Sequence, residues 1–339
     1  MLRSAGWGKG RSRVVAGVAA VAVSIGLAAA CTPPPSDPGS PPTTVVPLPE
    51  PPGSFSVLAY NVAGLPQGIS GSEPERNLPL ISPLLNAYDV VLTQEDFDWW
   101  VPVAGLLDFA NYHTRLRAQA EHPYRSDRHP GPEAVGVDAS SRGLLVGDGI
   151  GIMARYPLTN ETHHAWKGCF GGVLPDGGAA DCLAMKGFRM MTMTLGDGRE
   201  VDVYSLHAEA GGTPQDQWLQ ERDYEELAAF IVARGGDRAI VLGGDTNLHT
   251  DLVHPDGSEG ADIEIWDRFL AVTGLTDVCT ELSCDEPGSI DKFAYRSGST
   301  VALQATSIDF PRSRFSVGGE ALSDHPPVVA LFDWDVPAS

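Results

Sequence analysis

Two short polar motifs, far apart in the chain, contain the residue types of a hydrolytic site. One is Gly-Gly-Asp-Thr-Asn at residues 243–247, and the other is Ser-Asp-His-Pro at residues 323–326. The first follows the aliphatic run 239–242 and the second precedes the run 328–332, and such runs are typical of buried strands. A rigid sheet holds side chains in fixed geometry, so these carboxylates, amide and histidine could together bind a cation and activate water.

Four further segments place polar side chains beside predicted strands. They are Tyr60-Asn61-Val62, Gln94-Glu95-Asp96, Ser205-Leu206-His207 and Ser289-Ile290-Asp291. Each alone has a simple structural explanation, such as a turn cap, a solvated loop acid or a core histidine. Their combination with the two motifs, in this order, instead favours one site for metal-assisted hydrolysis.

Strands and helices are predicted to alternate along residues 54–339, which we interpret as one domain. The helix that begins at the capping box Thr213-Pro214-Gln215-Asp216 ends before Gly235, and a second helix is expected at 263–272. A tight hairpin is expected at residues 196–198. Predicted strands cover residues 55–60, 89–94, 149–154, 188–195, 200–207, 239–243, 289–295 and 327–332. The interleaving indicates stacked sheets covered by helices rather than a purely parallel sheet.

The six segments together resemble the endonuclease/exonuclease/phosphatase superfamily, the fold of deoxyribonuclease I, across residues 54–335. This resemblance implies an α/β (α+β) fold, a four-layer sandwich of two packed, mostly antiparallel sheets flanked by helices. It also implies hydrolysis of a phosphodiester with Mg²⁺ or another hard divalent cation.

The resemblance also implies the metal ligands. Glu95 matches the principal metal carboxylate, while Asn61 and Asp324 match residues that complete the metal environment, partly through water. Oxygen ligands of this kind suit Mg²⁺, which keeps several waters. Glu73 and Glu75 are the candidates for the second metal carboxylate found in some members.

The catalytic roles follow from the same resemblance. His207 and Asn247 match donors to the phosphoryl oxygens, where negative charge develops in the transition state. Asp245 and His325 match the residues that activate or position the attacking water, and either could take the proton.

An acidic residue is expected to orient the His325 ring by the logic of a base held by a carboxylate. Asp291 matches this residue, and Asp309 is the alternative. We prefer Asp291 because residues 290–296 better resemble the family's strand.

One segment bears on the substrate. Residues 181–187 read Asp-Cys-Leu-Ala-Met-Lys-Gly and resemble the Asp-x-x-x-x-Lys-Gly element of neutral sphingomyelinases. The resemblance implies that Lys186 contacts phosphate or substrate and that Asp181 positions it; the alternative is a surface ion pair at a strand start. We therefore expect sphingomyelinase C-like cleavage of a phospholipid head group by a monomer.

Other functions use the same residues. An extracellular nuclease acting on nucleic acid is the enzymatic alternative, and a non-catalytic surface binding module is the other. The chain has 44 acidic and 23 basic residues, which argues against broad electrostatic capture of nucleic acid. Trp99-Trp100, Trp166 and Phe170 could contact a membrane surface if they are exposed.

The N-terminal region indicates export. Residues 1–30 carry four basic residues before an uncharged stretch that ends in Ala-Ala-Ala, as in a secretory signal peptide. The small residues before Cys31 resemble a bacterial lipobox, in which this cysteine is acylated; cleavage by ordinary signal peptidase is the alternative. Residues 31–53 form a proline-rich linker. We expect a cell-surface lipoprotein or a secreted protein.

Four cysteines remain if Cys31 carries lipid, and they fall into two local pairs. We predict the disulfides Cys169–Cys182 and Cys279–Cys284, as suits an oxidising compartment. A zinc site is the alternative, although neither pair has Cys-x-x-Cys spacing.

Overall fold

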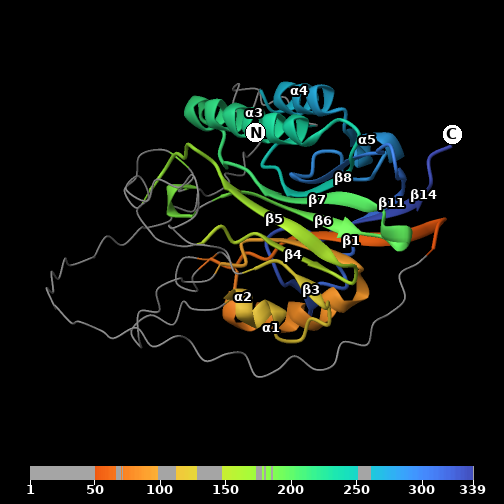
Figure 1. Ribbon diagram of the computed structural model, residues 1–339. Helices are drawn as coiled ribbons and strands as arrows, with labels where there is room; N and C mark the ends of the chain where they lie inside the picture. The colour runs from red at the N-terminus through yellow and green to blue at the C-terminus, as the bar shows by residue number, and fades with distance from the viewer. Residues whose placement is uncertain are drawn as a thin grey trace, which may run out of the picture. The chain divides into compact units, whose positions relative to one another are not determined.

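Two six-stranded sheets pack face to face, and helices cover the outer face of each (Figure 1). The computed structural model describes residues 50–65, 70, 72–97, 112–127, 147–172, 178, 181–184, 186–250 and 261–338. The predicted signal peptide, Cys31, most of the linker and Trp99-Trp100 lie outside these residues. No helix within the described ranges is long and apolar enough to cross a membrane.

The first sheet has the strand order β11-β14-β1-β2-β4-β3. Its strands are β1 (Gly53–Asn61), β2 (Val90–Gln94), β3 (Tyr124–Arg125), β4 (Gly151–Ala154), β11 (Ala302–Asp309) and β14 (Val328–Asp335). Its helical cover consists of α1 (Pro74–Ile81), the 3₁₀ helix η1 (Ser82–Ala87) and α2 (Tyr112–Arg117).

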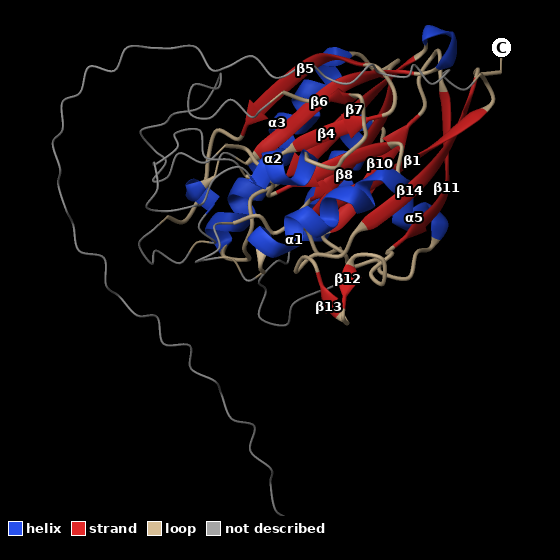
Figure 2. Cartoon of the chain, turned by 90° about the horizontal axis from the view of Figure 1, so that it is seen from below, coloured by secondary structure: helices blue, strands red, loops and turns tan. Residues whose placement is uncertain are grey.

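The second sheet has the strand order β5-β6-β7-β8-β10-β9. Its strands are β5 (Leu158–Ala165), β6 (Gly187–Thr194), β7 (Glu200–His207), β8 (Ala239–Asp245), β9 (Thr276–Asp277) and β10 (Asp291–Arg296). The other elements are α3 (Pro214–Arg234), α4 (Asp262–Thr273), α5 (Val278–Leu282), the 3₁₀ turns η4 (Asp181–Leu183) and η5 (Gly196–Gly198), and a small hairpin of β12 (Ser316–Val317) and β13 (Glu320–Ala321), which Figure 2 shows below the sheets.

Each sheet contains one parallel pair among otherwise antiparallel described neighbours. In the first sheet β1 runs parallel to β2, and in the second β7 runs parallel to β8. Parallel neighbours require a crossover, which α1 and η1 supply in one sheet and α3 supplies in the other. The predicted four-layer, mostly antiparallel sandwich is therefore confirmed.

The alternation of side chains along the strands fills three apolar layers. Val57 packs between the sheets, whereas its neighbour Leu58 packs beneath α1 and α2. In the same way Val241 points between the sheets and Leu242 points toward α3 and α4. Successive residues of a strand face opposite sides, so a strand covered on both faces must be apolar throughout.

The sequence features that predicted helix α3 and the hairpin at residues 196–198 are present in the structure. Thr213 and Asp216 form the capping box, Pro214 occupies the first turn, and Gly235 follows the last helical residue. Residues 196–198 join the antiparallel strands β6 and β7. Both predicted disulfides, Cys169–Cys182 and Cys279–Cys284, are present.

Two long strands were not predicted, β5 and β11. Both lie at the edge of a sheet, and polar residues interrupt their sequences, LTNETHHA and ALQATSID. An edge strand has one pairing partner and is half exposed, so it lacks the continuous apolar run that marks the central strands.

The second glycine of the 243–247 motif is required by the close approach of β7 and β8. Gly244 has φ +141°, and a Cβ there would lie 2.2 Å from the carbonyl oxygen of Leu206. By contrast, a Cβ on Gly198 (φ +73°) would meet no described atom within 4 Å.

We predict that Gly244→Ala lowers the free energy of unfolding by about 3 kcal/mol, because it adds a backbone clash to the strained φ. Gly198→Ala should cost about 1 kcal/mol, from conformation alone. Urea unfolding of both variants measures the difference. Equal losses would show that the close approach at Gly244 does not matter.

Candidate active site

The strand pairing brings most of the predicted site residues to one edge of the two sheets. Asn61 lies opposite Gln94, so Glu95 follows directly beside it. His207 lies opposite Asp245, and Asp291, at the start of β10, lies opposite Asp245 on the other side. Parallel strands end at the same edge, which is why segments so distant in sequence meet here.

Asn61 joins the carboxylates of the two sheets. Its amide Nδ2 donates to Glu95 Oε1 at 3.1 Å and to Asp245 Oδ2 at 3.0 Å. Its Oδ1 accepts from the backbone N–H of Ala63 at 3.0 Å, which fixes the amide orientation. Burial raises the pKa of Glu95, and the nearby Lys186 opposes that shift. Two carboxylates thus face one small space, where a divalent cation would compensate their charge.

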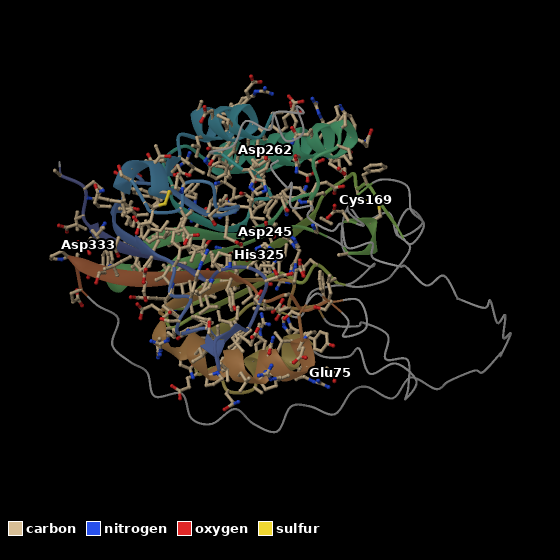
Figure 3. The ribbon with its side chains drawn as sticks, turned by 180° about the vertical axis from the view of Figure 1, so that it is seen from behind. Glu75, Cys169, Asp245, Asp262, His325 and Asp333 are labelled. Atoms are coloured by element: carbon tan, nitrogen blue, oxygen red, sulfur yellow. A yellow bond between two sulfur atoms is a disulfide. The ribbon has the colours of Figure 1, made fainter. Side chains whose placement is uncertain are left out.

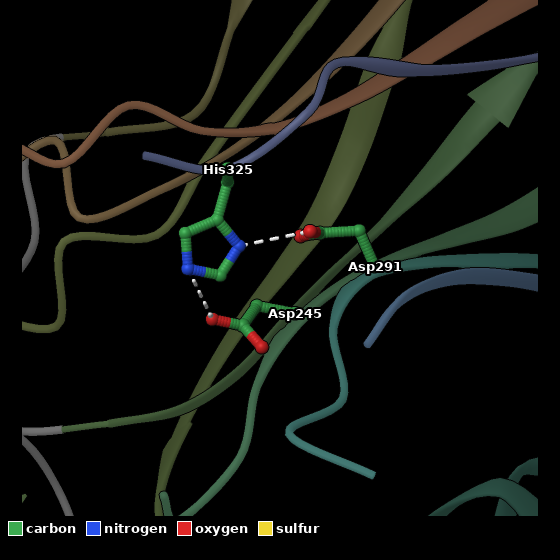
Figure 4. A group of neighbouring side chains, drawn as sticks. All are labelled: Asp245, Asp291 and His325. Atoms are coloured by element: carbon green, nitrogen blue, oxygen red, sulfur yellow. Dashed lines mark hydrogen bonds and ion pairs between the residues drawn. The ribbon is translucent and has the colours of Figure 1, made fainter. Parts of the chain in front are cut away.

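His325 lies between two aspartates (Figure 4). Its Nδ1 is 2.8 Å from Asp291 Oδ2, and its Nε2 is 3.8 Å from Asp245 Oδ2. Burial alone would lower the pKa of His325, but the two carboxylates outweigh it and raise the pKa to about 10. The ring is therefore an imidazolium at neutral pH. Asp309, the alternative partner, lies on the edge strand β11 and accepts from Phe310 N–H.

His207 is buried beside Asp245. Its Nε2 lies 3.4 Å from Asp245 Oδ2 and 3.9 Å from Glu95 Oε1. Burial and the neighbouring Lys186 lower the pKa of His207 well below its usual value, so the ring is neutral. The indole N–H of Trp166 donates to the His207 carbonyl at 2.9 Å, and Trp166 is itself buried rather than available to a membrane.

Asn247 and Asp245 are held by their own loop. The backbone N–H of Asn247 donates to Asp245 Oδ1 at 3.0 Å, and its side-chain Nδ2 donates to the Ala208 carbonyl at 3.0 Å. Although burial favours its neutral form, the charges of His325 and Lys186 lower the pKa of Asp245. Asp245 is therefore an anion surrounded by donors.

Lys186 and Asp181 form a buried ion pair beside this group. Lys186 Nζ also donates to the Ala208 carbonyl at 3.3 Å, and Asp181 Oδ2 accepts from Ala210 N–H at 3.1 Å. Despite burial, Asp181 and Asp245 raise the pKa of Lys186, which is therefore charged. The pair is buried, so the alternative of a surface ion pair is wrong.

The three other candidate metal residues are Asp324, Glu73 and Glu75, and none of them lies beside Asn61 and Glu95 in the way that Asp245 does. Asp324 is exposed, and with Asp291 and His325 it lines a pocket of about 470 Å³. Glu75 lies on the outer helix α1, away from Asp245 and His325 (Figure 3), and Glu73 precedes that helix and pairs with Arg76. Neither Glu73 nor Glu75, the two candidates for a second metal carboxylate, therefore lies at the site.

A second possible ligand set overlaps the first. Asp245, Asp291 and His325 offer ligand atoms within 4.8 Å of one another. Two members of this group, Asp291 and His325, are also hydrogen-bonded to each other at 2.8 Å. This pairing supports the orienting role of Asp291, and the three side chains form a second candidate set of metal ligands.

Glu209 was not assigned a role from sequence. It is buried two residues after His207 and accepts the backbone N–H of Phe170, while its own N–H donates to Asp223 Oδ2 at 3.2 Å. Burial raises the pKa of Glu209 to about 9, and Asp181 adds to the shift. This residue ties the Cys169–Cys182 segment to the loop after His207. Its position two residues after a site histidine was a signal in the sequence.

The comparisons with known proteins agree with this geometry. The model of the Endonuclease/Exonuclease/phosphatase family matches residues 58–325. A Mycobacterium tuberculosis protein named sphingomyelinase is 29% identical over an alignment of 299 residues that covers 83% of this chain and 53% of that protein. The chain thus spans about half the length of the curated relatives it matches.

Solved structures share the fold. Sphingomyelinase C from Streptomyces griseocarneus has a TM-score of 0.56 at 19% identity, covering 82% of this chain and 99% of that chain. A beta toxin mutant from Staphylococcus aureus with bound magnesium ions also has a TM-score of 0.56, at 17% identity and with the same coverage.

We predict that Glu209 makes stability depend on pH. In the folded protein the Glu209 carboxyl keeps its proton up to about pH 9, whereas a glutamate in the unfolded chain releases its proton near pH 4.3. The contribution of Glu209 to stability is therefore complete below about pH 4.3 and is lost as pH rises toward 9, by at most about 1.4 kcal/mol per pH unit. Glu209→Gln should flatten this decline between pH 5 and 8.

Calorimetric unfolding at several pH values measures the effect. Glu225→Gln is the matched control, because Glu225 lies on α3 with an exposed side chain. Parallel pH curves for Glu209→Gln and wild type would contradict the prediction.

Proposed function

The chain belongs to the endonuclease/exonuclease/phosphatase family, and we propose that it is an exported, Mg²⁺-dependent phosphodiesterase of the sphingomyelinase C type. The single observation that carries the proposal is the convergence of His325, Asp245, His207, Asn61 and Glu95 within hydrogen-bonding and ion-pair distances. The products would be a lipid alcohol and a phosphorylated head group.

The donor set fits a hard cation. Glu95 and Asp245 share the Asn61 amide, and carboxylate oxygens with water are the surroundings that Mg²⁺ prefers. We assign the principal ligand role to Glu95, with Asn61 and Asp324 completing the environment through water. When bound, the cation would neutralise the phosphoryl oxygens and stabilise the leaving alkoxide.

The charges of the side chains favour a division of roles between Asp245 and His325. Asp245 is an anion and can accept the proton of the attacking water. His325 carries both ring protons, with Asp291 on Nδ1, so its Nε2–H can donate toward the phosphoryl group. Neutral His207 and the Asn247 amide are the other candidate donors to oxygens where charge develops.

The lipid substrate is supported by Lys186 and by the relatives. Lys186 is a buried cation whose charge acts on Glu95, Asp245 and His207, and Asp181 holds it in place. Curated relatives that match most of this chain are named sphingomyelinases. Export is supported by the signal-like residues 1–30 and the two disulfides; acylation of Cys31 remains part of the proposal.

We predict that the purified protein releases phosphocholine from sphingomyelin vesicles with Mg²⁺ and loses this activity in excess chelator. His325→Ala should lower the rate by at least about 100-fold, because it removes the proton donor. DNA degradation is followed in parallel. DNA loss without phosphocholine release would replace the lipid proposal with a nuclease. Activity on neither substrate would contradict both assignments and point to another phosphoester substrate for the same site.

We further predict that Lys186→Met lowers kcat on the same lipid by about 100-fold, the usual cost of removing one charge-stabilising donor. Lys167→Met is the matched control, since Lys167 is 75% exposed and pairs with Glu226 on α3. The control should keep wild-type activity. A Lys186 variant that loses stability but keeps its kcat per folded molecule would make Lys186 a structural residue.

A further inference from the structure

The backbone at Glu95 adopts a conformation that its own residue type disfavours. Glu95 has φ +58°, in the left-handed region that few non-glycine residues occupy. Such a conformation persists only where the surroundings impose it. The surroundings are tight, because a Cβ on Gly64 would lie 2.1 Å from the Glu95 carbonyl oxygen and one on Gly149 would lie 3.2 Å from the Glu95 Cα.

The next residue, Asp96, anchors this turn. Its carboxylate is fully buried, where Oδ2 contacts Arg117 Nη1 and lies 3.1 Å from His113 Nδ1. The Thr93 hydroxyl donates to the same oxygen at 3.1 Å. The backbone N–H of Asp96 donates to the Gly149 carbonyl at 3.0 Å. Both the side chain and the backbone of Asp96 are therefore fixed.

Arg117 ties the turn to helix α2. The guanidinium is buried, and a Cβ on Gly151 would lie 2.3 Å from Arg117 Nη2. Gly151 therefore leaves the room that Arg117 fills. A planar guanidinium with a fixed fork of donors holds its partner in one geometry, unlike a flexible ammonium.

We propose that Asp96, held by Arg117, is a positioning residue that sets the backbone of Glu95 and thereby aims its carboxylate at the cation. The role rests on the proposed function, because it assumes that Glu95 is the metal ligand. Partners of metal ligands commonly tune affinity in this way, and their loss typically weakens binding about 10- to 100-fold.

A general contribution to folding is the competing explanation, and the chain offers a matched control for it. Asp202 is equally buried and also pairs with arginines, Arg234 and Arg238. It lies near the start of β7, whereas His207 lies at the site end of that strand. Asp202→Asn should therefore lower thermal stability without changing the affinity for Mg²⁺.

Titration calorimetry of Mg²⁺ into the wild-type protein, Asp96→Asn and Asp202→Asn tests the proposal, without relying on turnover. We expect the Kd for Mg²⁺ to rise about 10- to 100-fold in Asp96→Asn and to change less than about twofold in Asp202→Asn. Arg117→Lys keeps a cation beside Asp96 but loses the fork, and it should give an intermediate Kd. If Asp96→Asn does not fold, the Kd of Arg117→Lys for Mg²⁺ tests the proposal instead.

The outcomes separate the two proposals. Wild-type affinity in folded Asp96→Asn, or in Arg117→Lys where it is decisive, would overturn the positioning role and leave the proposed function intact. Equal weakening in Asp202→Asn would also overturn it, because the effect would then follow stability alone. Absence of Mg²⁺ binding by the wild-type protein would overturn both proposals.

Discussion

The site depends on the single parallel strand pair in each sheet. Parallel strands end at the same edge, so β1 with β2 brings Asn61 beside Glu95, and β7 with β8 brings His207 beside Asp245. The antiparallel neighbour β10 begins where β8 ends, which adds Asp291 at that edge. An all-antiparallel arrangement would place alternate strand ends on opposite edges. The helical crossovers are therefore as necessary to the site as the residues themselves.

Collecting acids at one edge creates an electrostatic problem that the fold must balance. Carboxylates buried close together repel one another and favour protonation. Nearby cations oppose this, since Lys186 and His325 act on Glu95 and Asp245, while Arg117 acts on Asp96. Each cation reaches the edge from a different part of the chain. The balance of charge at the site therefore depends on three separate parts of the chain, namely the disulfide-linked segment before β6, helix α2 and the loop before β14.

The central strands and the helices α3 and α4 could be predicted from sequence because their signals are local. A strand buried on both faces, such as β8, is an uninterrupted apolar run, and α3 carries its own capping box. The strands β5 and β11 carry no such signal, because their identity comes from the neighbour with which they pair. Helix α2 is similar, since Arg117 in its last turn pairs with Asp96, which lies in a distant part of the sequence.

The site residues that could be predicted also carry a local sequence signal, whereas those that could not be predicted depend on contacts with distant residues. Strand-end polar residues such as Asp245 and His325 stand out beside apolar runs. The sequence already favoured Asp291 over Asp309, and the fold puts the two in different sheets, with Asp291 hydrogen-bonded to His325. Asp96 follows a predicted metal ligand, yet its function depends on Arg117, 21 residues away and brought near only by folding. A residue that acts through a distant partner has no local pattern. Because such partners also fix the backbone at Glu95, the precision of the site is set by contacts that the motifs themselves do not contain.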